Sequence, residues 1–163
     1  MTTTEHTIND TLAEVLMETR SLWRFKDVVR SENIDVLKSS GKRPDILITE
    51  PNVSPVIVET EILPAISVES DAKQRLGEHL SPSGRRILSS LAVRLPVRLR
   101  DFSGQPLKDE IINSSDFEIA LYTGESPEAC TRWLLSISEM GHFLNRTLWH
   151  NQAALTSSLR PWL

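Results

Sequence analysis

Two short apolar runs that contain acidic residues constrain the fold of this chain more than any other feature. They span residues 41–48 and 54–62, and both are rich in β-branched and aliphatic side chains with Gly, Pro, Ser or Asn near their ends. This composition is typical of short buried strands, and the turn between them predicts a hairpin. Acidic residues are rare in strands and costly to bury, so Asp45, Glu59 and Glu61 need a physical reason.

A divalent metal ion would supply that reason. Side chains alternate along a strand, so Glu59 and Glu61 project from the same face, where Asp45 of the paired strand can join them. Three carboxylates on one face form an oxygen-rich pocket suited to Mg²⁺ or Mn²⁺. The hairpin therefore predicts a metal site.

This pattern resembles the PD-(D/E)xK nuclease superfamily, which has the restriction-endonuclease-like fold, over about residues 8–100. In that family a Pro-Asp begins one strand, a Glu-x-Lys lies on the next, and the two acids hold the catalytic metal ion. Pro44-Asp45 and Glu59-Thr60-Glu61 take these places, with Glu61 where the family has lysine. The resemblance implies an α/β fold with a mixed β-sheet flanked by helices. It also implies Mg²⁺ or Mn²⁺ bound by Asp45, Glu59 and the Thr60 carbonyl, and hydrolysis of DNA.

The lysine that Glu61 replaces has either moved to another part of the chain or is absent, in which case the domain does not cut. Apolar residues recur at helical spacing from about Val68 to Leu80, so we expect a helix there. Lys73 and Arg75 fall on opposite flanks of its buried stripe, so one of them should lean toward the hairpin. By resemblance to the family, Lys73 is the candidate for a relocated catalytic lysine. The alternative is a lysine whose stem only covers apolar surface.

A first helix is expected over residues 8–20, with Thr7 or Asn9 as its cap, followed by a first strand at residues 33–37. Glu18 lies near the edge of the apolar stripe of this helix. Many proteins of the resembled family bring a Glu from the first helix to the metal ion, so Glu18 is a candidate ligand by resemblance. A solvated surface Glu is the alternative.

Positive charge is concentrated directly after the acidic hairpin. Residues 73–100 contain Glu78 as their one acidic residue among several Lys and Arg, whereas the chain from residue 101 onward is net acidic and the whole chain has a formal net charge of −4. This balance argues against a protein that coats nucleic acid through bulk positive charge, but it allows a local DNA-binding surface. A solvated basic face is the alternative. The candidate DNA contacts are Lys42, Arg43, Arg75, Arg85 and Arg86.

The remaining pattern completes one domain. We expect a strand at residues 86–95, parallel to its neighbour through a right-handed crossover. A short helix at 107–112, a strand at 117–123 and one or two helices that include Trp133 and Leu134 follow. The chain has 163 residues and one cysteine, Cys130, and it contains no signal-peptide pattern and no long apolar run. We therefore expect a single cytoplasmic domain, residues 1–163, without a membrane partner.

Three interpretations of function stay open. The first is a metal-dependent nuclease domain that hydrolyses phosphodiester bonds in DNA. The second is a catalytically inactive domain of the same fold that binds nucleic acid or a protein partner in a larger assembly, alone or as a homodimer, and Glu61 supports it. The third is a structural adaptor in which Asp45 and Glu59 pair with Lys42, Arg43 or Arg75, because buried ion pairs are close to neutral in free energy.

Overall fold

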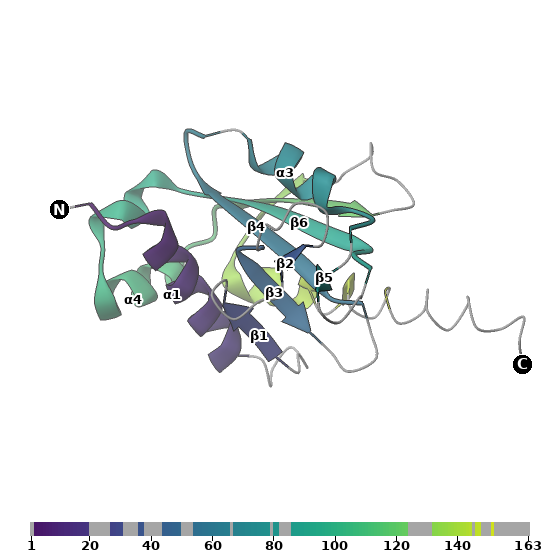
Figure 1. Cartoon of the computed structure of the whole chain (residues 1–163). Helices are drawn as coiled ribbons and strands as arrows, with labels where there is room; N and C mark the ends of the chain where they lie inside the picture. Colours follow the sequence, from purple (N-terminus) through teal and green to yellow (C-terminus); the bar gives the residue numbers. More distant parts are fainter. Residues whose placement is uncertain are drawn as a thin grey trace, which may run out of the picture.

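The computed structural model describes residues 2–19, 27–30, 36–37, 44–49, 54–65, 67–78, 80–81, 86–123, 132–144, 146–147 and 151. They form an α/β protein with a mixed open sheet flanked by helices, as predicted (Figure 1). The elements in chain order are α1 (Glu5–Glu18), β1 (Asp27–Arg30), β2 (Val36–Leu37), β3 (Ile46–Thr49), β4 (Val56–Ile62), α3 (Val68–Arg75), β5 (Leu80–Ser81), β6 (Ser89–Leu95), the 3-10 helix η2 (Val97–Asp101), α4 (Gly104–Asn113), β7 (Phe117–Thr123) and β8 (Arg132–Leu135). A further helical segment covers residues 137–144.

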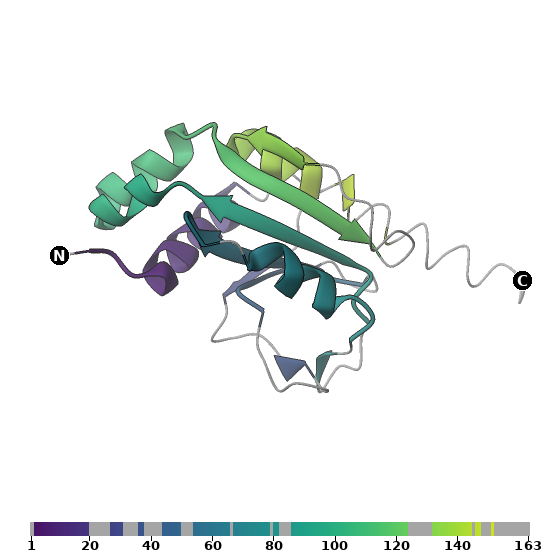
Figure 2. The same ribbon diagram turned by 90° about the horizontal axis from the view of Figure 1, so that it is seen from above.

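The main sheet has the strand order β1-β3-β4-β6-β7-β8 within the described residues. β4 and β6 are parallel, and the other neighbouring pairs are antiparallel. The predicted hairpin is confirmed as β3 and β4, with Ile46 opposite Val58. The predicted parallel neighbour is confirmed as β6, and α3 forms the crossover between β4 and β6 (Figure 2).

The first strand does not lie where the sequence predicted it. The prediction of a strand of the main sheet at residues 33–37 is wrong, because Asp27–Arg30 pairs with β3 instead. Val36–Leu37 pairs with Leu80–Ser81 in a separate two-stranded sheet. Both segments contain two adjacent apolar residues, so composition could not decide between them. The four-residue β1 satisfies more backbone groups along β3 than a two-residue strand could.

The predicted start of the first helix is also wrong. Helix α1 begins at Glu5, and its cap is Thr4 rather than Thr7 or Asn9. The Thr7 N–H donates to Thr4 Oγ1 at 3.2 Å, which satisfies one of the free N–H groups of the first turn. Asn9 is instead buried inside the helix, where its side chain is available for a tertiary contact.

Two later elements differ from their predictions. Helix α3 ends at Arg75 rather than near Leu80, because Gly77 adopts a φ of 82° and its N–H bonds the Ile87 carbonyl at 2.9 Å. Trp133 and Leu134 belong to strand β8, which pairs with β7, and not to a helix. Large apolar side chains suit either element, so tertiary pairing decided the outcome. The strand predicted at 117–123 and the helix predicted at 107–112 are confirmed in β7 and α4.

The two faces of the sheet have different cores. Val56, Val58 and Ile62 of β4 join the main hydrophobic cluster, together with α1, α4 and the helical segment 137–144. We call this side the α1 face. The alternating residues of β4 face α3, where a smaller cluster of Val68 and Ala72 with Ala92, Ala120 and Tyr122 forms the α3 face. Among the described helices, none is both long and apolar enough to cross a membrane.

Candidate functional site

Asp45 lies at the point where the hairpin strands β3 and β4 begin to pair. It directly precedes β3, and the register of Ile46 with Val58 continues to place Asp45 opposite Glu59. Asp45 Oδ2 accepts a hydrogen bond from the Thr60 N–H at 2.9 Å and lies 3.3 Å from the Thr60 hydroxyl. The Asp45 carboxylate is therefore held in place by the backbone of the neighbouring strand.

Asn9 connects this pair of strands to α1. Its side-chain Oδ1 accepts a hydrogen bond from the Thr60 hydroxyl, and both residues are buried. The hydroxyl proton can serve only one acceptor at a time, so Thr60 Oγ1 lies between two competing acceptors, Asn9 and Asp45. The polar residue in the apolar stripe of α1 thus fixes the side chain next to Asp45.

Glu59 is the most perturbed acidic residue that the structure describes. Only 6% of it is exposed, and its Oε1 accepts a hydrogen bond from Arg75 Nε at 3.2 Å. Burial, followed by the neighbouring Asp45 carboxylate, raises the pKa of Glu59 to about 8, although Arg75 opposes the shift. Two adjacent carboxylates in a buried site cannot both ionise easily, so Glu59 holds a proton at neutral pH.

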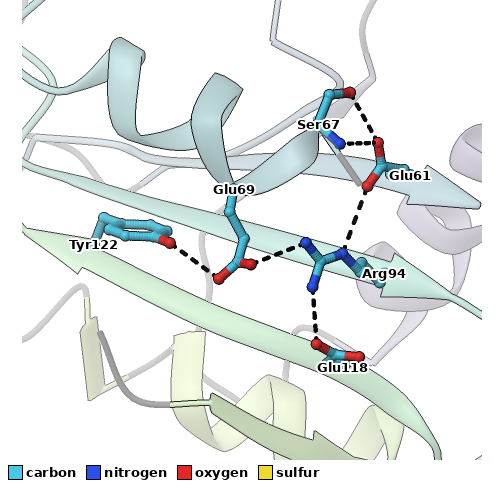
Figure 3. Close-up of polar contacts among 6 residues, drawn as sticks. All are labelled: Glu61, Ser67, Glu69, Arg94, Glu118 and Tyr122. Carbon is cyan, nitrogen blue, oxygen red and sulfur yellow. Dashed lines mark hydrogen bonds and ion pairs between the residues drawn. The ribbon is translucent and has the colours of Figure 1, made fainter. Parts of the chain in front are cut away.

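Glu61 has different partners from Glu59, although both side chains lie on the α3 face. Its Oε1 accepts hydrogen bonds from the Ser67 N–H at 2.7 Å and the Ser67 hydroxyl at 2.9 Å (Figure 3). Its Oε2 lies 3.6 Å from Arg94 Nε in an ion pair, and neither of these two buried atoms has a hydrogen bond. Glu61 is therefore bound to the start of α3 and to strand β6.

Arg94 joins four elements of the α3 face through this network (Figure 3). Its Nη2 lies 2.9 Å from Glu69 Oε2, and its Nη1 lies 2.9 Å from Glu118 Oε1. The Tyr122 hydroxyl donates to Glu69 Oε1 at 3.0 Å. The register aligns Glu61 with Arg94 and Arg94 with Glu118, so these side chains are direct cross-strand neighbours.

The three-carboxylate pocket expected from the alternation does not form in the described structure. Within the described residues, no three His, Cys, Asp or Glu side chains are placed so that they could hold a metal ion. The reason is physical: Ser67 donates hydrogen bonds to the Glu61 carboxylate and Arg94 forms an ion pair with it, and both draw it away from the other two acids. What the structure brings together is Asp45, Glu59 and Thr60.

Glu18 lies apart from this group. It is exposed at the end of α1 and forms an ion pair with Lys108 of α4. The helical rise separates it by about 13 Å along the axis from Asn9, which reaches Thr60. The part of α1 that approaches the acidic pair is therefore its first half.

Glu5, at the start of α1, responds electrostatically to the acidic residues of the hairpin. Burial, followed by the negative charge of Asp45, raises the pKa of Glu5, and Glu61 adds to the shift. Glu5 and Asn9 are four residues apart and so share one side of the helix. The sequence analysis considered Asn9 only as a helix cap and did not consider Glu5. The available signal was a polar residue, Asn9, within the apolar stripe of the helix.

The basic candidates have separate locations. Arg75 is buried against Glu59, and Lys73, two residues earlier in α3, is half-buried. Arg86 is exposed, and its guanidinium lies beside Gly77. The candidates Lys42, Arg43 and Arg85 lie outside the described residues. Arg94, which the sequence analysis counted only as part of the basic stretch, is the centre of the network on the α3 face.

Comparison of the chain with models of protein families found no match, and a search of curated proteins found none either. The function must therefore be argued from the α/β fold and from the chemistry of the α3 face. Two polar groups are available there: the pair Asp45 and Glu59 with Arg75, and the network around Arg94.

Proposed function

We propose that this chain is a metal-dependent nuclease domain that hydrolyses phosphodiester bonds in DNA. One observation carries the proposal: Asp45 and Glu59 face each other across the hairpin, in a site where burial and mutual repulsion raise the pKa of Glu59 to about 8. A strongly perturbed acid with a specific charged neighbour is a frequent property of functional sites. Repulsion between two buried acids lowers stability, so stability alone does not explain why they are adjacent.

The element order supports the same proposal. A helix, three antiparallel strands, a second helix and a strand parallel to the third follow one another as α1, β1, β3, β4, α3 and β6. The restriction-endonuclease-like core has the same order, with Asp45 directly before the second strand, β3, and Glu59 on the third, β4. The small sheet of β2 and β5 is an addition to that order.

The donor set suits a hard divalent cation. Mg²⁺ is commonly bound through one or two carboxylates, with water and substrate phosphate as the remaining ligands. Asp45 and Glu59, with the Thr60 carbonyl, would hold Mg²⁺ or Mn²⁺, and the bound ion would activate water and neutralise charge on the phosphate. The hydrogen bond from the Thr60 N–H keeps the Asp45 carboxylate directed to this position.

A specific observation favours a second candidate, a domain of the same fold that binds DNA or a protein partner without cutting. Glu61 occupies the position of the family's lysine and is bound by Ser67 and Arg94. Glu59 already has a cationic partner in Arg75. On this view the acids stabilise the α3 face, and divalent metal ions have no role.

Metal binding and cleavage should be measured on the same preparations. We would titrate Mn²⁺ and Mg²⁺ calorimetrically at pH 7 into the wild type and into Asp45→Asn/Glu59→Gln, in two buffers of different ionisation enthalpy, and assay plasmid nicking. The proposal predicts that the wild type binds an ion, releases about one proton per ion from Glu59, and nicks the plasmid. The double variant should do none of these.

A matched control removes two carboxylates away from the site. Asp101→Asn/Asp109→Asn changes two exposed residues and the same number of charges, and it should behave as the wild type. A wild type that binds no metal ion would overturn the nuclease proposal. Metal binding without nicking would overturn hydrolysis alone, and DNA binding without metal binding would favour the second candidate.

A further inference from the structure

Arg75 is a buried cation at the edge of the acidic pair. Its side chain is 9% exposed, and it is the last residue of α3. Lys73 lies two residues earlier, about 200° around the helix axis, so the two side chains leave α3 on nearly opposite sides. Of the two, Arg75 is the one that contacts Glu59, at 3.2 Å through Nε.

The contact with Glu59 uses only one of the five N–H donors of the guanidinium. Within the described part of the chain, Glu59 is the only hydrogen-bond or ion-pair partner of the Arg75 side chain. The fully buried polar atoms that lack a hydrogen bond there belong to Glu61, Glu78, Ser90 and Arg94, so the Nη atoms of Arg75 keep a path to solvent. The four remaining N–H donors, on the two Nη atoms, are therefore available beside the acidic pair.

We propose that these two Nη atoms bind a phosphate oxygen of the DNA backbone at the Asp45–Glu59 pair. Arg75 thereby supplies, from helix α3, the positive charge that the strand lacks at Glu61. The inference rests on the proposed function for its substrate, a phosphodiester. A guanidinium suits this role because it binds phosphate through two parallel hydrogen bonds and stays charged when buried.

The Glu59 contact would orient the guanidinium for this task. A long side chain that is already fixed at Nε loses little further rotamer freedom when it binds an anion at Nη. The negative charge of the acidic pair beside Arg75 would repel a phosphate. A divalent ion bound by these acids would remove that repulsion. Binding of DNA at Arg75 should therefore be stronger when a divalent ion is present.

The test is binding of a fluorescein-labelled 20-base-pair duplex, measured by anisotropy with Ca²⁺ at several salt concentrations. Arg75→Ala should weaken binding about tenfold and reduce the salt slope by about one, because one phosphate contact is lost. Arg75→Lys keeps the charge but not the paired donors, so its affinity for the duplex should lie between those of the wild type and Arg75→Ala. Arg146→Ala removes an exposed arginine from the helical region that follows β8 and should bind as the wild type.

A second variant guards against misfolding. If Arg75→Ala leaves Glu59 without its partner and unfolds, Arg75→Ala/Glu59→Gln removes the acid as well and should be compared with Glu59→Gln alone. Three outcomes would each overturn the inference. Arg75→Ala/Glu59→Gln and Glu59→Gln could bind the duplex equally well, or Arg75→Ala and Arg146→Ala could lose the same affinity. The third is a wild type that does not bind the duplex. A selective loss at Arg75 would support it even if the wild type never nicks plasmid, a result that would overturn the proposed function alone.

Discussion

The two faces of the sheet use the same strands for opposite purposes. On the α1 face, β4 contributes Val56, Val58 and Ile62 to a large apolar cluster that is almost completely buried. On the α3 face, the same strand contributes Glu59 and Glu61, which are similarly buried but form ion pairs with Arg75 of α3 and Arg94 of β6. Burial is similar on the two sides, and only the chemistry differs.

This difference teaches where the fold obtains its stability. Apolar burial contributes about 25 cal/mol per Å² removed from water, whereas buried ion pairs are close to neutral overall. The α1 face therefore carries most of the stabilisation. The α3 face holds charged groups at fixed positions, and it can do so because the opposite face supports the strands.

The largest effect should come from a cavity in the α1 face. Phe117 of β7 is completely buried in the main cluster, so Phe117→Ala should lower the free energy of unfolding by about 3–5 kcal/mol. Urea unfolding followed by tryptophan fluorescence measures this loss. Ile112→Ala, at an exposed apolar residue of α4, is the matched control and should cost less than about 1 kcal/mol. A small loss for Phe117→Ala would contradict the assignment of stability to this face.

The α3 face should show its dependence on charge pairing when Arg94 is replaced. Arg94→Met leaves the carboxylates of Glu61, Glu69 and Glu118 without their common cation, and we expect a loss of about 3 kcal/mol in urea unfolding. Arg94→Met/Glu61→Gln removes the most buried of these charges and should recover part of the loss. If both variants were as stable as the wild type, the network would be a surface feature without energetic consequence.

Much of the fold could be predicted because local patterns and the sheet agree. Residues 46–48 and 56–58 are continuous apolar runs with turn residues nearby, and the predicted hairpin forms around them. Strand β1 could not be assigned in the same way, since Val28–Val29 and Val36–Leu37 present equally short apolar runs. The choice between them depends on long-range pairing, which no local pattern records.

The candidate site shows the same limit at the level of side chains. Strand alternation correctly places Glu59 and Glu61 on one face, but it does not state which cation each acid will meet. The partner of Glu61, Arg94, is more than 30 positions later in the chain and becomes its neighbour only through the parallel pairing of β4 and β6. Likewise Asn9 reaches Thr60 across 51 positions, through the packing of α1 on the sheet.

The smallest effect per pH unit concerns the proton on Glu59, and the pKa of Glu59 determines the direction of that effect. Burial and Asp45 raise the pKa of Glu59 in the folded protein from 4.5 to about 8. Between these values the folded protein holds a proton that the unfolded chain has released. The free energy of unfolding should therefore fall as the pH rises, by about 1 kcal/mol per pH unit. The stabilisation from the proton on Glu59 is complete below pH 4.5 and is lost above pH 8.

Glu59→Gln removes this dependence, because an amide does not titrate. In urea unfolding at pH 5, 6, 7, 8 and 9, the variant should lack the wild-type slope and should gain on the wild type as the pH rises toward 8. Asp109→Asn, at an exposed residue of α4, should keep the slope. A wild-type profile without the slope would mean that burial and Asp45 do not raise the pKa of Glu59 in the folded protein. The charge contrast between the two faces would then rest on the Arg94 network alone.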